Sequence, residues 1–189
     1  MPDGAAPARA DARRNRARLV VAARELFEEV GTADAAMNDV ARRAGVGPGT
    51  LWRHFPNKDA LVAEVVGESL DDLDGLARDL RDDPDPGAAL HRWASELVRH
   101  VGRYRGLVTS LACAADADSP LAARSRTVEA AAAALVQRAL EEGRVRADVT
   151  VADVVRLATG VVWAAEAAGE PGAAGRLLDL AFDGLRTHP

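Results

Sequence analysis

The stretch "GVGPGTLWRHFPNKDALV", residues Gly45 to Val62, is the most informative part of the sequence. Its alternating glycines, followed by Thr50, have the look of a loop that holds a phosphate. Such a loop needs a strand in front of it, whereas the preceding residues, "DVARRA", read as helix. It also needs a lysine directly after the last glycine, and the only lysine in the sequence is Lys58. We therefore interpret the stretch as the corner of a helix-turn-helix.

A helix-turn-helix explains the individual residues of this stretch. Two helices that cross steeply need a small residue where they touch, which Ala41 supplies, and a residue that tolerates positive φ at the corner, which Gly45 supplies. The small residues before Thr50 keep the start of the second helix thin, so that it can approach a groove of DNA. The apolar residues expected to form the small core are Val40, Ala44, Val46, Leu51 and Phe55.

The rest of the chain reads as helix. Apolar residues at three- and four-residue spacing predict a helix from Arg13 that stops at Gly31, and Asn57 is the expected N-cap of a long helix that ends before Pro84. Four further helical patterns cover residues 88–104, 119–143, 150–168 and 173–185. No segment alternates with a period of two. The sequence predicts an all-α protein with an N-terminal three-helix helix-turn-helix domain and a helical C-terminal domain.

Composition supports a globular protein of this class. The chain has 189 residues, of which 48% are hydrophobic and 28% are charged, so a disordered chain is excluded. Cys113 is the only cysteine, which excludes an internal disulfide and fits a reducing compartment. No apolar run approaches the roughly 18 residues of a membrane span, and the N-terminus has no apolar signal segment. We expect a soluble, cytoplasmic protein with no membrane partner.

Charge is unevenly distributed along the chain. Residues 1–60 hold 10 Lys or Arg and 8 Asp or Glu, a net charge of +2, which leaves −7 for residues 61–189. A basic head on an acidic body is compatible with an anionic partner for the head, although many folds carry such an imbalance without any partner.

Catalytic and metal sites are not indicated. No nucleophile, base and orienting group occur together, and the four histidines, His54, His91, His100 and His188, are scattered. We expect no catalytic residue, no metal and no cofactor. Two other classes stay open as alternatives, an enzyme and a helical interaction module without DNA function. The interaction module leaves the exposed Trp52, Arg53 and His54 unexplained.

The segment from Arg13 to Val66 resembles the DNA-binding head of TetR-type (tetracycline-repressor family) transcriptional regulators. Trp52 departs from that pattern, because the family usually has a tyrosine there whose hydroxyl reaches a backbone phosphate. Ala35 and Ala36 also depart, because the family often opens the second helix with Thr or Ser, and alanine offers no capping oxygen. The residues that carry the resemblance are Ala23, Phe27, Gly31, Val40-Ala41, Ala44-Gly45-Val46, Thr50-Leu51, His54-Phe55, Lys58 and Leu61.

The resemblance implies a homodimeric transcriptional regulator, most often a repressor, that binds a palindromic operator in double-stranded DNA and responds to a small molecule of unknown identity. It implies a flexible basic arm over residues 1–12, a helix-turn-helix domain over 13–60, and a ligand-binding and dimerisation domain over 61–189. The expected DNA contacts are Asn38, Gly47, Pro48, Gly49, Thr50, Trp52, Arg53, His54 and Lys58.

The arm and the C-terminal domain carry further expectations with open alternatives. The basic residues Arg9, Arg13, Arg14 and Arg16 either follow DNA phosphates or enter a minor groove, or else they form a frayed, solvated terminus. The residues that could line a ligand pocket, with ordinary core packing as the alternative, are Trp93, His100, Tyr104, Cys113 and Trp163.

The last two helices carry small and aliphatic residues that suit a four-helix bundle between two subunits. The alternative is that both helices are buried within a monomer. The residues expected at the dimer interface are Val154, Leu157, Val161, Leu177, Leu178, Ala181 and Leu185.

Overall fold

The computed structural model describes residues 5–104, 106 and 120–186. Its elements, in order, are α1 (Ala5–Val30), α2 (Met37–Ala44), α3 (Pro48–His54), α4 (Lys58–Asp79), α5 (Pro86–Arg103), α7 (Pro120–Glu141), α8 (Val151–Ala167), the 3₁₀ turn η1 (Pro171–Ala173) and α9 (Ala174–Leu185). Within these residues the only β pairing is an isolated bridge between Val145 and Arg186. The predicted all-α fold is confirmed.

Helices α1, α2 and α3 form a compact head, in which α1 packs against both shorter helices. The corner lies where the sequence predicts it. Gly45 ends α2 with φ of 63°, and the chain turns at Gly47 so that Pro48 is the first residue of α3. Leu51 and Phe55 are buried together with Val40 and Ala44 beneath α1.

The basic residues before and at the start of the predicted first helix lie in α1. Residues 5–12 are helical and continue α1, because their alanines favour helix. The guanidinium of Arg16 donates to Glu64 of α4 and lies 5.0 Å from the ring centroid of Phe55. Arg14 pairs with Asp11 within the helix. The Arg9 side chain lies outside the described residues.

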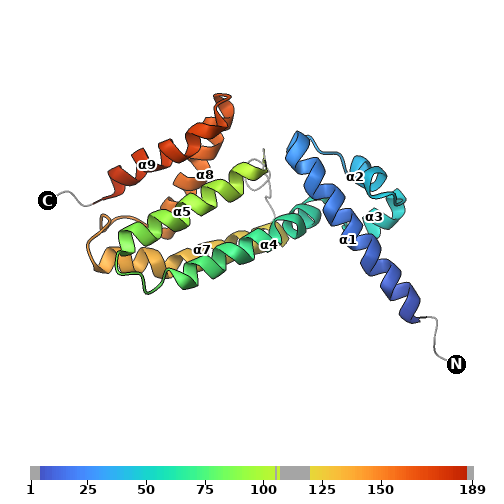
Figure 1. Cartoon of the computed structure of the whole chain (residues 1–189), viewed down its shortest axis with the longest axis horizontal. Helices are drawn as coiled ribbons and strands as arrows, with labels where there is room; N and C mark the ends of the chain where they lie inside the picture. Colours follow the sequence, from blue (N-terminus) through green and yellow to red (C-terminus); the bar gives the residue numbers. More distant parts are fainter. Residues whose placement is uncertain (1–4, 105, 107–119, 187–189) are drawn as a thin grey trace.

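Helix α4 connects the head to the body, as Figure 1 shows. It begins behind Asn57, whose side chain accepts a hydrogen bond from the backbone N–H of Ala60 at 2.8 Å, as predicted. It then runs without a break across the predicted domain boundary at residue 60 and packs against α1 near its start and against α7 beyond. A change in the direction of α4 therefore moves the head relative to the body.

The body is built from α5, α7, α8 and α9 together with the second half of α4 (Figure 1). Helix α5 contacts all four of these neighbours, and its Trp93 is fully buried, with the indole N–H donating to the carbonyl oxygen of Leu73 at 3.1 Å. Helix α8 begins with a capping box formed by Thr150 and Asp153. None of the helices, searched over the part of the chain that the structure describes, is long and apolar enough to cross a membrane.

Candidate nucleic-acid interface

Helix α3 has one buried and one exposed face. Leu51 is fully buried and Phe55 nearly so, and these two side chains fix the helix against α1. Trp52 and Arg53 lie on the opposite side, where the Trp52 side chain is 45% exposed. We define the α3 surface as the residues of this exposed side and of the helix entry: Gly47, Pro48, Gly49, Thr50, Trp52, Arg53 and His54.

The entry to α3 is thin. A Cβ atom added at Gly47 or Gly49 would meet no atom within 4 Å, so packing inside the subunit gives no reason for glycine at either position. The space beside these two glycines is open to solvent and accessible to a binding partner. The start of α3 can therefore come closer to a DNA groove than a helix with larger residues would.

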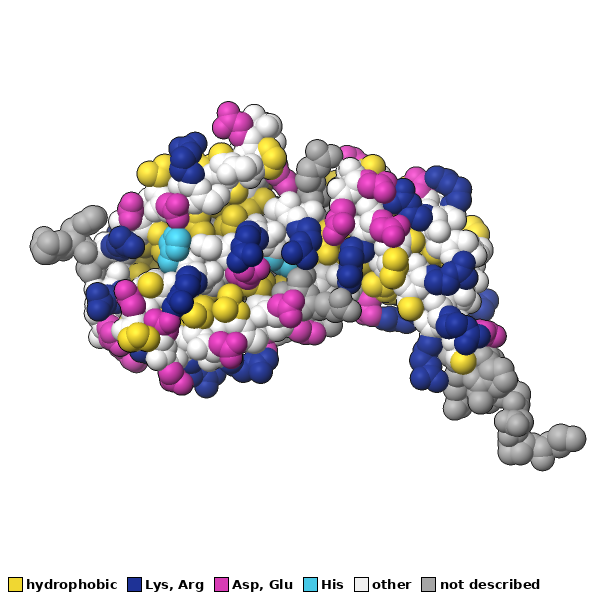
Figure 2. All heavy atoms as spheres, viewed as in Figure 1, with side chains coloured by type: hydrophobic (Ala, Val, Ile, Leu, Met, Phe, Trp, Pro, Cys, Tyr) yellow, Lys and Arg dark blue, Asp and Glu magenta, His cyan; other side chains and the backbone are white. Residues whose placement is uncertain are grey.

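Arg53 is the cation of the α3 surface that is available for an outside partner. Within the described part of the chain it makes no hydrogen bond or ion pair. Arg42 instead pairs with Asp39 at 2.7 Å, and the guanidinium of Arg43 donates to both carboxylate oxygens of Glu29 at 2.7 Å each. This hydrogen bonding lowers the pKa of Glu29 and raises that of Arg43. Lys and Arg side chains line the outer end of the head in Figure 2.

Two other predicted DNA contacts lie beside α3. Asn38 is exposed in the first turn of α2. Lys58, however, does not stand free beside α3. Its Nζ donates to the carbonyl oxygen of Ala33, in the loop between α1 and α2, at 2.8 Å, and burial lowers the pKa of Lys58. An ammonium group has two further N–H donors, so a phosphate contact by Lys58 stays a prediction.

The predicted ligand residues do not all come together. Trp93, His100 and Tyr104 lie on one buried face of α5. Trp163 was expected with them, but its side chain is 58% exposed, because α8 turns it away from the stripe that packs into the body. Trp163 is therefore not part of an enclosed pocket within the subunit. Cys113 lies outside the described residues.

His100 is the unusual residue of the α5 face. It is 5% exposed, its ring makes an edge contact with Tyr104 at 6.3 Å between centroids, and its Nδ1 has no hydrogen-bond partner among the residues that the structure describes. Burial, with a smaller effect from Arg103, lowers the pKa of His100 to about 4, so the imidazole is neutral at pH 7. An unpartnered polar atom in the interior costs about 1–3 kcal/mol. A bound molecule that hydrogen-bonds to Nδ1 would remove that cost.

The lowered pKa of His100 predicts a pH-dependent stability. Between pH 6.5 and about 4 the unfolded chain binds a proton at this residue and the folded protein does not, so stability is full above pH 6.5 and falls through this window. We expect a loss of ~3 kcal/mol from this group. The variant His100→Gln should flatten the profile of unfolding free energy between pH 4.5 and 6.5, measured by urea denaturation. His91→Gln is the control, and an equal flattening by both variants would contradict the assignment to His100.

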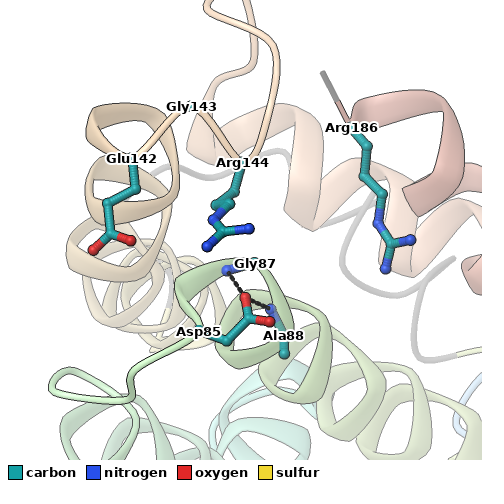
Figure 3. Close-up of a pocket in the computed structure, with 7 residues that line it drawn as sticks. All are labelled: Asp85, Gly87, Ala88, Glu142, Gly143, Arg144 and Arg186. Atoms are coloured by element: carbon teal, nitrogen blue, oxygen red, sulfur yellow. Dashed lines mark hydrogen bonds between the residues drawn. The ribbon is translucent and has the colours of Figure 1, made fainter. Parts of the chain in front are cut away.

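One of the surface pockets in the described part of the body is lined by residues other than the predicted ligand residues. This pocket of about 440 Å³ lies where α5 begins, beside the turn after α7 and the end of α9 (Figure 3). Asp85 accepts hydrogen bonds from the backbone N–H groups of Gly87 and Ala88 at 3.1 Å each, so this helix end is already capped. Arg144 and Arg186 form the rim (Figure 3). None of the predicted ligand residues takes part.

The predicted dimer interface needs a correction. Val154 and Leu178 are buried inside the subunit, with at most 1% of either residue exposed, so neither can be offered to a partner. The stripe of α8 that packs inward consists of Val154, Ala158, Val162 and Ala165. The other five predicted residues are half-buried: Leu157, Val161, Leu177, Ala181 and Leu185.

Two large apolar residues on α8 and α9 were missed as interface candidates. Trp163 is 58% exposed and Leu180 is 59% exposed. Their degree of exposure depends on how α8 and α9 rotate against the body, which helical spacing alone does not fix. We call Trp163, Leu180 and the five half-buried residues the α8–α9 face.

Comparisons with known proteins agree with this arrangement. Residues 19–65 match the sequence profile "Bacterial regulatory proteins, tetR family", and residues 85–187 match "Transcriptional regulator SbtR-like, C-terminal domain". The chain belongs to the TetR family of transcriptional regulators.

Individual members of the TetR family match over different lengths. A TetR transcription regulatory protein from Mycobacterium vanbaalenii is 35% identical, with 96% of this chain and 100% of that chain covered and a TM-score of 0.55. A TetR transcriptional regulator from Streptomyces coelicolor is 30% identical, with coverages of 92% and 99% and a TM-score of 0.61. An HTH-type transcriptional regulator of Staphylococcus aureus (strain USA300) is 39% identical over 75 residues, and this chain spans 40% of its length.

One structural feature of this TetR-family head follows from its departure at Ala35 and Ala36. Ala36 is the N-cap of α2 and makes no side-chain hydrogen bond, while Ala35 is buried. The start of α2 therefore lacks a capping oxygen, as the sequence predicts. The described residues of this TetR-family chain contain no group of three or more His, Cys, Asp or Glu arranged to hold a metal.

Proposed function

We propose that the protein is a ligand-responsive repressor that binds a palindromic operator as a homodimer. The observation that carries the proposal is the α3 surface, where Trp52 and Arg53 are exposed opposite the buried Leu51 and Phe55. Large exposed side chains on the second helix of a helix-turn-helix are what groove recognition needs. Such a repressor acts where the chromosome lies, in the bacterial cytoplasm, and we assign it no enzymatic activity.

Arg53 and Trp52 have separate roles in this proposal. The free guanidinium of Arg53 can bind a phosphate oxygen or form two hydrogen bonds with the edge of a guanine. Trp52 offers an apolar face and an indole N–H where relatives have a tyrosine hydroxyl. The remaining contacts come from Asn38 at the start of α2, from the thin helix entry, and from Thr50 and His54 at the edge of the groove. Lys58 adds a backbone contact.

Dimerisation through the α8–α9 face would place two heads on one DNA duplex. TetR-family regulators bind operator DNA, typically as dimers. Two recognition helices related by a two-fold axis read inverted half-sites that are about one helical turn apart or slightly more. The exposed Trp163 and Leu180 support this choice over burial of both helices in a monomer, because a monomer leaves two large apolar side chains in water.

The effector would bind at the buried face of α5. His100 supports this choice, because its Nδ1 is buried and the described part of the chain offers it no hydrogen-bond partner. Ligand binding there would tilt α4 and so change the separation of the two heads. This is a shift between populations, and it requires that the ligand prefer one spacing of the heads over the other.

The salt dependence of DNA binding tests the proposal. Each phosphate that the protein neutralises lowers the slope of log K against log of salt concentration by about 0.9. We expect fluorescence anisotropy to give tight binding to duplexes from the protein's own promoter region and a steep negative slope. No binding to any duplex at 50 mM salt would overturn the proposal.

The variant Arg53→Ala should remove one contact from each half-site. If Arg53 binds phosphate, the dimer loses about 1.8 from the magnitude of the slope, because both subunits lose a contact. If Arg53 binds a base, the slope of log K against log of salt concentration is unchanged. The variant then loses about 1–3 kcal/mol of the free energy by which one base pair in each half-site is preferred. Arg43→Ala is the control, since Arg43 is already paired with Glu29. Equal effects of the two substitutions in anisotropy titrations would contradict a special role for Arg53.

A further inference from the structure

The body touches the head at a second place besides α4. Gly106, just beyond the end of α5, lies against the loop between α1 and α2. A Cβ atom added at Gly106 would lie 3.2 Å from the Cβ and 3.3 Å from the backbone nitrogen of Ala33, and 3.5 Å from Oγ1 of Thr32. Figure 1 shows α5 ending beside the turn between α1 and α2. Two of these three distances are shorter than ordinary van der Waals contacts, so a methyl group at this position would push Ala33 away by a few tenths of an ångström.

The loop touched by Gly106 is also held by a hydrogen bond from α4. Nζ of Lys58, at the start of α4, donates to the carbonyl oxygen of Ala33 at 2.8 Å. Thr32 is fully buried, and the backbone N–H of Ala35 donates to the carbonyl oxygen of Gly31 at 3.2 Å. The hydrogen bond from Lys58 therefore ties the backbone of Ala33 to the start of α4. It leads directly into α2, so a displacement of Ala33 is passed to the start of that helix.

Gly106 also lies close to the proposed effector region. Tyr104, two residues before it, ends α5, is buried and makes the edge contact with His100. The backbone at Gly106 has φ of +74°, where an L-residue is strained. Position 106 therefore requires glycine for two independent reasons, the backbone conformation and the contact with Ala33.

We propose that Gly106 is a positioning residue that sets the place of the α1–α2 loop and thereby couples the end of α5 to the head. This inference rests on the proposed function. It adds a second path by which ligand binding in the body can change the position of the head. A change at His100 and Tyr104 reaches α2 through Gly106 and Ala33, alongside the tilt of α4. A displacement of α2 relative to α3 changes how well the two helices fit one DNA groove.

The test compares two glycine substitutions in the full-length protein. Gly106→Ala introduces both the strain and the close contact. Gly169→Ala is the matched control, because Gly169 has nearly the same φ, +72°, and an added Cβ there meets nothing within 4 Å. We expect Gly106→Ala to weaken operator binding about tenfold or more, at an unchanged dimer dissociation constant, and Gly169→Ala to change it less than about twofold. The probe is the duplex that wild-type protein selects from random DNA, in anisotropy titrations.

A second readout separates positioning from general loss of stability. Gly106→Ala should speed amide hydrogen exchange at residues 31–44 and leave exchange in α8 and α9 unchanged. Adding Ala33→Gly removes the 3.2 Å contact and should restore part of the affinity. If Gly106→Ala does not fold, Ala33→Val presses on the same contact from the head and should weaken binding in the same direction.

Three outcomes overturn the inference: equal affinity losses for the two glycine variants, no loss for Gly106→Ala, or exchange that rises uniformly over the whole protein. If wild-type protein binds no DNA, the proposed function fails on its own. The exchange pattern at residues 31–44 then still decides whether Gly106 positions the loop.

Discussion

Replacing Phe55 with alanine should cost about 3–5 kcal/mol of stability and abolish DNA binding by unfolding the head. Phe55 is 2% exposed and closes α3, with its backbone N–H donating to the carbonyl oxygen of Leu51 at 2.8 Å. Its ring also lies under the guanidinium of Arg16, 5.0 Å from the ring centroid. The substitution therefore leaves a cavity in a small core and removes a cation–π contact.

Urea denaturation of the full-length protein, followed by circular dichroism, measures this loss. The control is Trp52→Ala, which removes an aromatic ring of the same helix from its exposed side. That variant should change stability by no more than about 0.5 kcal/mol while it weakens DNA binding. If Phe55→Ala retains stability and affinity, the core assigned to the head is wrong.

Replacing Leu180 with glutamate should raise the dimer dissociation constant at least about 100-fold. Leu180 is 59% exposed on α9, so the subunit itself does not need its apolar side chain. In a two-fold interface the substitution places two unpaired carboxylates against an apolar face, and each buried unpaired charge costs about 3–5 kcal/mol. Operator affinity should fall with dimerisation, because a single head keeps only one half-site.

Sedimentation velocity over a concentration series measures the dimer directly. Val21→Glu is the matched control, since Val21 is 56% exposed on α1 of the head and lies on neither α8 nor α9. It should leave the dimer dissociation constant unchanged. A Leu180→Glu protein that stays dimeric at micromolar concentration would show that the α8–α9 face is not the interface.

The corner of the head could be predicted because its signals are local. Gly45 is required at positive φ, Pro48 opens α3, and the side chain of Asn57 caps α4. Each of these depends on a few neighbouring residues only. The same holds for the buried pair Leu51 and Phe55, whose spacing of four places both on one face of the helix.

Contacts between distant segments could not be predicted. Lys58 lies against Ala33, twenty-five positions earlier, and Arg16 lies against Glu64, forty-eight positions later. The spacing of residues within one helix contains no information about such pairs. Gly106 belongs to this group as well, because its close neighbour Ala33 is in another domain.

The body was predicted less well than the head for a related reason. On α8 the residues Val154 and Trp163 both fit a helical stripe, and only the packing of α8 against its neighbours decides which faces inward. The burial of His100 was not foreseen as distinct from that of Trp93. The two residues differ in their hydrogen bonds. The indole N–H of Trp93 donates to the carbonyl oxygen of Leu73, whereas Nδ1 of His100 has no partner within the described ranges.

Selection of bound duplexes from a pool of random DNA tests whether the protein recognises a palindromic operator as a dimer. Purified protein should enrich an inverted repeat whose half-sites lie about one helical turn apart or slightly more, since two copies of the α3 surface would face one side of the duplex. The substitution Arg53→Ala should change the preference within each half-site or lower retention evenly. A retained pool with no enriched inverted repeat, or no retention at low salt, would contradict the account.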